Sequence, residues 1–338
     1  MNNNVYGIDL GTSNLKVFSK SNGKIFMEKN TIAIRGKDEI FAYGDKAYAM
    51  YEKAPESIQV VFPVTTGVIA EFHDMEEFIY EFLDDKTKGK VKNAEFVVAV
   101  PTDITDVEKR AFYELFTGKR FHAKSVLLCE KPIADAVGLG IDVNEPTGVM
   151  IVNMGGDTTE ISVISLGGLV LSDLLHFGGN RLDESIISYI RKEFNLIIGQ
   201  KTAMQLKERI GSGLPGRTET MVIVGRDVVS GLPIEMEISA EVVYNAIKAN
   251  LESICSSIKM ILEKTPPELA KDIIHSGIYI TGGGAKIDNL DKLFEQISNI
   301  KVNVSDAPEE SSVRGLVKIV SDPKYRYLPF TIKTSLLK

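Results

Sequence analysis

Two stretches of the sequence share one pattern, in which an apolar strand runs into a glycine-containing turn and a second strand follows. The first stretch runs from Val5 to Phe18 and the second from Val149 to Val163. Their turns contain Gly11-Thr12-Ser13 and Gly155-Gly156-Asp157, where the backbone can adopt dihedral angles that most residues avoid. Successive backbone N–H groups in such turns bind anions. Two copies in one chain predict two related halves that clamp one nucleotide.

A third glycine turn, Gly282-Gly283-Gly284, follows the predicted strand from Ile278 to Thr281. Without side chains it would let a flat base approach the backbone closely. A single glycine turn is weak support for a site, because any tight strand connection favours glycine. Three such turns, two of them with a preceding polar residue and following hydroxyls, favour nucleotide binding. The Gly-Lys-Ser/Thr phosphate loop and the dinucleotide fingerprint are both absent from the sequence.

Charge and cysteine content exclude several other classes of protein. The 338 residues carry a net charge of -7, which argues against a nucleic-acid partner because such surfaces are usually basic. Cys129 and Cys255 are far apart in apolar segments, so we expect buried, inert thiols in a reducing compartment. The N-terminus carries no targeting signal, and no apolar run reaches the roughly 18 residues of a membrane span. We therefore expect a cytoplasmic protein.

Strands that alternate with helices predict an α/β fold with mostly parallel sheets and an antiparallel hairpin at the start of each domain. The turn-forming segment 144–148 marks the domain boundary. We assign residues 1–147 and 315–338 to the first domain, with a subdomain inserted at about 31–63, and residues 148–314 to the second, with a subdomain at about 183–245. Helices are predicted at 74–83, 105–116, 133–140, 182–194, 202–210 and 240–263, and further strands at 96–100, 124–129, 220–225, 234–239 and 278–281.

These motifs resemble the superfamily of actin, sugar kinases and heat-shock chaperone ATPases, and within it the bacterial actin MreB family. Gly7 to Thr12 is similar to the first phosphate motif, Gly155 to Glu160 to the second, and Glu130 to Gly138 to the helix that connects them. The longest similar stretches run from Val100 to Ala111 and from Glu263 to Gly284. The resemblance extends from about residue 5 to about residue 320.

The resemblance implies an actin-like fold of two related domains, each with a five-stranded mixed sheet flanked by helices, and ATP or ADP with Mg²⁺ between them. It also implies head-to-tail stacking of identical subunits into a cytoskeletal filament that helps set cell shape. Two alternatives stay open: a non-polymerising ATP-dependent switch of the same fold, and a filament for motility of a wall-less cell. A sugar kinase would need sugar-binding insertions, and a chaperone a peptide-binding domain; we expect neither.

The resemblance also assigns roles to individual residues. Asp9 and Asn153 would hold Mg²⁺ through water, Thr158 would lie near the γ-phosphate, and Lys207 and Glu208 would lie on the helix that reaches the ribose. For Glu208, an ordinary solvated charge is an equal alternative. The residues expected to bind the nucleotide are Asp9, Gly11, Thr12, Ser13, Asn14, Lys16, Asn153, Gly155, Gly156, Asp157, Thr158, Gly178, Gly179, Lys207, Glu208, Gly282, Gly283 and Gly284.

Two positions depart from the family pattern in the region expected to carry out hydrolysis. Asn153 stands where the family has an aspartate, and its amide lacks the charge that a hard divalent cation prefers. Lys131 stands where the family has a glutamate that orients or activates water, and an ammonium cannot act as that base. We therefore predict an ATPase of low activity at most, in which Lys131 pairs with a phosphate oxygen and Thr158 remains near the reacting phosphate.

Two further positions bear on the same site. Lys16 stands where actin carries a phosphate-binding lysine and MreB proteins usually have an apolar residue. Asp157 stands where the family has a third glycine. It would either restore a carboxylate that faces the metal or only shape the turn, and both interpretations stay open.

Two segments are candidates for peripheral contact with the inner face of the membrane. Lys86, Lys88, Lys90 and Lys92 surround Val91, and near an anionic bilayer each lysine would contribute about 1 kcal/mol, although a solvated loop is the simpler interpretation. The aromatic tail from Tyr325 to Phe330 would contact a membrane or a partner, or else pack back on the first domain.

Overall fold

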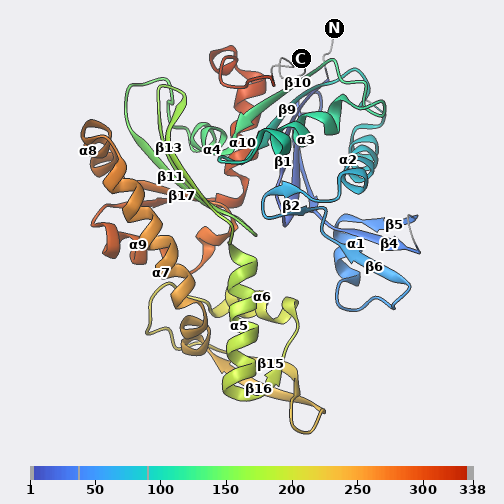
Figure 1. Cartoon of the computed structure of the whole chain (residues 1–338), viewed down its shortest axis with the longest axis vertical. Coiled ribbons are helices and arrows are strands. Elements are labelled where there is room, and N and C mark those ends of the chain that lie inside the picture. Colours follow the sequence, from blue (N-terminus) through green and yellow to red (C-terminus); the bar gives the residue numbers. More distant parts are fainter. Residues whose placement is uncertain (1–3, 37–38, 90, 333–338) are drawn as a thin grey trace. The chain divides into compact units, whose positions relative to one another are not determined.

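A computed structural model describes residues 4–36, 39–89 and 91–332. The described chain forms two compact units (Figure 1). The first unit comprises the chain up to Pro146, Ile164–Leu174 and the residues from Glu310 onward, and the second comprises Thr147–Val163 and Leu175–Glu309. The segment Ile164–Leu174, which lies on the second-domain side of the predicted boundary, is grouped with the first unit by compactness, and Leu174 is buried with that unit's apolar core.

The first unit is built on a five-stranded sheet of order β10-β9-β1-β2-β3. Strands β1, β9 and β10 pair in parallel, whereas β2 pairs antiparallel with both β1 and β3. All six residues of β1 are buried, as its continuous apolar sequence predicts for a central strand. The strand bounds are β1 (Val5–Leu10), β2 (Asn14–Ser19), β3 (Lys24–Lys29), β9 (Glu95–Val100) and β10 (Ser125–Glu130).

A second five-stranded sheet has the order β13-β12-β11-β17-β18. Read from β18 to β13, this order repeats that of the first sheet from β10 to β3, strand for strand. In each sheet three consecutive strands come first along the chain, and two later strands join beside the first of the three. This repetition confirms the prediction of two related halves. The bounds are β11 (Val149–Met154), β12 (Thr159–Ser165), β13 (Gly168–Leu175), β17 (Ile278–Thr281) and β18 (Val302–Val304).

Aromatic side chains fill the core of the first unit. Phe96 on β9 stacks on Phe116 at a ring distance of 4.7 Å and on Tyr6 at 5.5 Å, and all three rings are fully buried. Helix α3 begins with a capping box in which Thr105 and Glu108 satisfy each other's backbone N–H groups. The helices packed on this unit include α2 (Phe72–Thr87), α3 (Asp106–Thr117), α4 (Lys131–Gly138) and α10 (Ser311–Ser321).

Helices α4 and α10 approach each other closely within the first unit. A Cβ on Gly315 would lie 1.7 Å from the carbonyl oxygen of Ala134, so only glycine permits this crossing. The buried hydroxyl of Ser312 donates to Asp135 Oδ1 at 2.6 Å. This contact fixes α4, and with it the position of Lys131 at the start of the helix.

Small sheets form the two subdomains. In the first unit, the sheet of order β5-β4-β6 and α1 lie within residues 32–61. In the second unit, a sheet of order β14-β15-β16 lies beside α5 and α6. The bounds are β4 (Ile32–Arg35), β5 (Glu39–Tyr43), β6 (Ile58–Val61), β7 (Val64–Thr65), β8 (Val68–Ile69), β14 (Leu196–Ile197), β15 (Thr220–Asp227), β16 (Pro233–Ser239) and α1 (Gly44–Met50).

The longest helix, α7, buries a stripe of apolar residues that includes Val243, Ile247 and Leu251, as predicted for a helix facing a core. Among the helices of the described residues, none combines the length and apolar character that crossing a bilayer requires. The helices of the second unit are α5 (Gly179–Phe194), α6 (Gln200–Ile210), α7 (Ala240–Lys264), α8 (Pro267–Ser276) and α9 (Leu290–Ser298), and the short 3₁₀ segments are η1 (Gly283–Lys286), η2 (Pro308–Glu310) and η3 (Pro323–Tyr325).

Both cysteines, Cys129 and Cys255, are buried free thiols, and burial raises the pKa of each. Each of the two segments considered for membrane contact has an apolar residue packed on the first unit, whereas Lys88 and Lys92 are exposed. Val91 is fully buried in the core of the first unit, and Phe330 forms two backbone hydrogen bonds of 2.8 Å with Leu128 of β10. The tail therefore packs back on the first unit, which was one of its predicted roles. Lys90 lies outside the described residues.

Candidate nucleotide-binding site

In the first unit, Asp9 lies between two lysine ammonium groups. The β1–β2 register places Lys16 directly opposite Asp9, and Lys16 Nζ donates to Asp9 Oδ2 at 3.0 Å. Lys131, the first residue of α4, brings its Nζ to 3.1 Å from Asp9 Oδ1. The Asp9 side chain is 2% exposed, whereas those of Lys16 and Lys131 are 9% and 17% exposed. Each carboxylate oxygen therefore has its own ammonium partner.

The two lysines keep Asp9 ionised. Burial by itself would raise the pKa of Asp9, because a carboxylate loses its hydration inside the protein. The positive charges of Lys131 and Lys16, with their hydrogen bonds, outweigh burial and lower the pKa to about 2. The cluster is thus a carboxylate with two ammonium groups at neutral pH.

The first glycine turn is held by an asparagine that the sequence interpretation missed. The side-chain Nδ2 of Asn30 donates to the carbonyl oxygen of Gly11 at 2.9 Å. The backbone N–H of Asn30 donates to the carbonyl oxygen of Ser13 at 3.1 Å. A Cβ on Gly11 would lie 2.9 Å from the Asn14 carbonyl oxygen, so the turn is tight. Thr12 is buried, whereas Gly11, Ser13 and Asn14 are partly exposed.

In the second unit, the second glycine turn packs on the start of α5. The N–H of Gly179 donates to the carbonyl oxygen of Gly155 at 2.9 Å, and a Cβ on Gly178 would lie 2.5 Å from that same oxygen. The turn itself is closed by a bond of 2.8 Å from the Gly155 N–H to the carbonyl oxygen of Thr158. The predicted residues 155–158 and 178–179 are therefore one local structure.

Asp157 has a partner at this place. The side-chain amide of Asn180 donates to Asp157 Oδ1 at 2.7 Å, and the Asn180 N–H donates to the carbonyl oxygen of Gly156 at 2.8 Å. These contacts favour the turn-shaping interpretation of Asp157 over a carboxylate that faces a metal. No pattern in the sequence singled out Asn180 as the residue that ties the turn to α5.

Lys207 holds the same helix start from another side. Its Nζ on α6 donates to the carbonyl oxygen of Gly179 at 2.8 Å and lies 2.8 Å from Asp183 Oδ1. Burial raises the pKa of Asp183 to about 6, although Lys207 acts in the opposite direction. Through these contacts Lys207 holds the start of α5 in place. Glu208, the next residue of α6, is exposed.

The three glycines of the third turn have different surroundings. Gly282 has a φ of +80°, and a Cβ there would lie 2.3 Å from the carbonyl oxygen of Met154. A Cβ on Gly284 would lie 2.4 Å from Met154 Cγ. A Cβ on Gly283, in contrast, would meet nothing within 4 Å. Packing against the end of β11 therefore requires two of these glycines, and Gly283 is the one with open space beside it.

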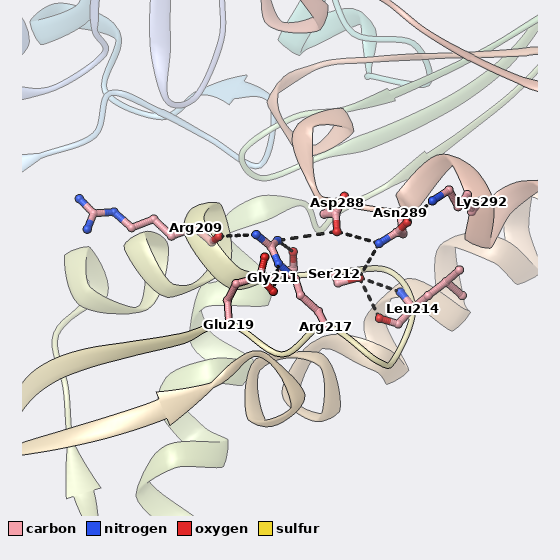
Figure 2. Close-up of polar contacts among 9 residues, drawn as sticks. All are labelled: Arg209, Gly211, Ser212, Leu214, Arg217, Glu219, Asp288, Asn289 and Lys292. Carbon is pink, nitrogen blue, oxygen red and sulfur yellow. Dashed lines mark hydrogen bonds and ion pairs between the residues drawn. The ribbon is translucent and has the colours of Figure 1, made fainter.

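Figure 2 shows a polar cluster that joins the end of α6 to the segment after the third turn. Arg217 donates to the carbonyl oxygens of Gly211 and Arg209 at 3.0 and 2.9 Å, and its guanidinium lies 3.0 Å from Glu219 and 3.9 Å from Asp288. The Gly213 N–H adds a bond of 2.7 Å to the Asp288 carbonyl oxygen. Two parts of the predicted site, α6 and the third turn, are thereby linked within the second unit.

The residues expected to hold Mg²⁺ do not fit this ion. Both oxygens of Asp9 contact ammonium groups, and Asn153 offers a neutral amide, whereas hard divalent cations favour anionic oxygen ligands. Within the part of the chain that the structure describes, no three His, Cys, Asp or Glu residues are grouped as metal ligands. In the first unit, the chemistry of these residues suits the phosphates of a nucleotide better, because a glycine turn can present backbone N–H groups and Lys16 and Lys131 add positive charge beside it.

Comparison with known proteins identifies the family. The sequence profile of the MreB/Mbl protein family matches residues 3–326. The chain is 36% identical to the cell shape-determining protein MreB of Escherichia coli strain K12, over 93% of this chain and 92% of that protein. It is also 36% identical to the cell shape-determining protein Mbl of Bacillus subtilis strain 168, over 89% and 91%.

Solved structures agree with this result. The crystal structure of MreB 5 of Spiroplasma citri bound to AMPPNP matches with a TM-score of 0.90 and 34% identity, covering 94% of this chain and 96% of that one. The MamK double helical filament matches with a TM-score of 0.80 at 22% identity, which shows the shared actin-like fold alone. The chain therefore belongs to the MreB/Mbl family and has the actin-like fold.

Proposed function

We propose that this chain is an MreB-family actin that binds ATP and ADP, polymerises into cytoskeletal filaments and hydrolyses ATP slowly. Family membership supports the cytoskeletal part, because relatives at 36% identity are named for determining cell shape. Nucleotide binding is supported by the similar MreB 5 structures of Spiroplasma citri, which are bound to AMPPNP and to ADP.

Each unit has its own candidate phosphate-binding elements. The first unit supplies the turn at Gly11–Ser13 with Lys16 and Lys131, and the second supplies the turn from Gly155 to Thr158. Gly178 and Gly179 pack against the second turn, and Lys207 holds Gly179 in place. Gly283 offers space for the base, and Glu208 remains a candidate for the ribose.

Slow hydrolysis rests on one observation, the contact of 3.1 Å between Lys131 Nζ and Asp9 Oδ1. An ammonium has no lone pair and so cannot accept a proton from an attacking water. General-base assistance typically contributes about 10²–10⁴-fold to a rate, and this chain has an ammonium at the position where the family supplies the base. Nucleotide would therefore act here mainly as a ligand that controls assembly.

Head-to-tail stacking of identical subunits does not close on itself and generates a filament. We place this filament in the cytoplasm. Contact with the inner face of the membrane would be electrostatic, through Lys86, Lys88, Lys90 and Lys92, because Val91 is packed in the core and unable to insert into lipid. Liposome flotation at low and high salt tests this contact. Electrostatic binding to anionic vesicles disappears at high salt, whereas salt-resistant binding would contradict it.

Negative-stain electron microscopy of the purified chain with ATP, with ADP and without nucleotide tests the main proposal. We expect filaments with ATP, and fewer or none without nucleotide. Particles that stay monomeric in all three conditions would instead support the non-polymerising switch. A role in guiding wall synthesis and a role in moving a wall-less cell both require this filament, so the experiment tests what the two have in common.

A further inference from the structure

The cluster of Asp9, Lys16 and Lys131 places excess positive charge beside a phosphate-binding turn. The Asp9–Lys16 pair lies on the β1–β2 hairpin, next to the pair Leu10–Leu15 that borders the turn. One carboxylate and two ammonium groups leave a net charge of +1 in a largely buried cluster. The ligand that fits beside this cluster is an anion rather than a divalent cation.

The fold fixes both ammonium groups before any ligand arrives. Lys16 is set by the strand register opposite Asp9, and its residue is 7% exposed. Lys131 is set by the start of α4, where Pro132 follows in the first turn and the α4–α10 crossing holds the helix. Asp9 then anchors both ammonium groups through its two oxygens. Charges held in this way lose little freedom when a phosphate binds.

We infer that this chain binds the polyphosphate of ATP and ADP without a divalent cation, with Lys16 and Lys131 supplying the positive charge that Mg²⁺ otherwise provides. This inference rests on the proposed nucleotide binding and adds to it the form of the ligand: the metal-free nucleotide. Asp9 acts as a positioning residue for the two lysines, since each of its oxygens contacts one of the two ammonium groups.

Equilibrium binding of a fluorescent ATP analogue, and competition by ATP, ADP and inorganic pyrophosphate, tests the inference in excess Mg²⁺ and in excess EDTA. We expect the Kd of ATP in EDTA to stay within about threefold of its value in Mg²⁺. A larger rise in EDTA would overturn the inference and leave nucleotide binding intact. Absence of binding in both conditions would overturn the proposed function itself. Competition by pyrophosphate as strong as that by ADP would identify the phosphates as the recognised group.

Substitutions test the role of Lys131. Lys131→Glu removes one ammonium and adds a carboxylate, so its affinity for ATP should fall by about tenfold or more when Mg²⁺ is removed. Lys192→Glu makes the same change of net charge at an exposed position on α5, 81% exposed, and should behave as the native protein. Lys131→Gln, which adds no new charge, serves if Lys131→Glu fails to fold. A Lys131 variant that binds ATP equally well with and without Mg²⁺, at native affinity, would contradict the assignment.

Discussion

The ammonium of Lys131 lies 3.1 Å from Asp9 Oδ1, and this contact joins the first residue of α4 to strand β1. With Lys16 on the other oxygen, it converts an aspartate that the family resemblance assigned to a metal into the centre of a positively charged cluster. Lys16 and Lys131 both depart from the family pattern, and both contact the same residue, Asp9.

Asp9→Asn should lower the free energy of unfolding, because it leaves two neighbouring ammonium groups without the carboxylate. The pKa of Asp9 is about 2 in the folded protein, against an ordinary value of 3.8 for an aspartate side chain. A lowered pKa stabilises the fold above pH 4, and this contribution is lost as the pH falls through 2. We expect a cost of about 2 kcal/mol at pH 7, measured by urea unfolding, and a smaller cost at pH 3. An equal cost at both pH values would contradict the ion-paired state.

Asp183 should show the opposite dependence on pH. Burial raises its pKa to about 6 from 3.8, so the folded state binds the proton more tightly than the unfolded state does. Its contribution to stability is present below pH 4 and is lost as the pH rises through 6. The stability of the native protein relative to Asp183→Asn should therefore fall by about 2–3 kcal/mol between pH 4 and pH 7. Thermal or urea unfolding of both proteins across this range checks the sign, and a relative stability that rises with pH would contradict it.

Arg217→Ala should destabilise the second unit, because it removes two hydrogen bonds to the carbonyl oxygens at the end of α6 (Figure 2). We expect a loss of about 1–3 kcal/mol in the free energy of unfolding. Glu219→Gln is the matched control. It weakens the ion pair of Arg217 with a 54% exposed carboxylate, leaves an amide oxygen that can accept the backbone N–H groups, and should cost less than about 1 kcal/mol. Equal losses in the two variants would show that the ion pair, rather than the contacts with the carbonyl oxygens, accounts for the stabilisation by Arg217.

Gly282 and Gly283 form a matched pair for substitution by alanine. Gly282→Ala places a Cβ 2.3 Å from a carbonyl oxygen at a φ of +80° and should cost about 1–3 kcal/mol of stability. Gly283→Ala meets open space and should leave stability nearly unchanged. If the base approaches the backbone there, Gly283→Ala lowers the affinity for ATP. A stable Gly283→Ala protein with native affinity would remove Gly283 from the binding site.

The strands that flank the glycine turns, the central strands β9 and β10 and helices α2 to α7 could be predicted from the sequence, because apolar periodicity and turn residues are local signals. The strands β3, β13 and β18 and the helices α8 to α10 were not predicted. Position 16 faces position 9 through hairpin register, which is also local. The contact between Lys131 and Asp9 depends on the order β10-β9-β1, which brings distant segments to one sheet edge. Local sequence patterns do not reveal this order, so the contact was not predicted.

Several supporting residues had no local signal at all. Asn30, Asn180 and Arg217 act by donating to backbone carbonyl groups or polar side chains that are distant in sequence or belong to irregular segments. Lys207 is expected on the helix that reaches the ribose, and no pattern in the sequence indicated its contacts with Gly179 and Asp183. The sequence shows that these residues are polar, but it does not show whether a polar side chain bonds to the protein or to water.

The rate of phosphate release shows whether Lys131 and Asn153 slow the hydrolysis of ATP in this protein. The native protein and its Lys131→Glu, Asn153→Asp variant are compared side by side with saturating ATP and Mg²⁺, after equal polymerisation is established. We expect the variant to release phosphate faster, by about tenfold or more, because a carboxylate then replaces the ammonium beside Asp9. A native protein that releases phosphate as fast as the variant would contradict this expectation.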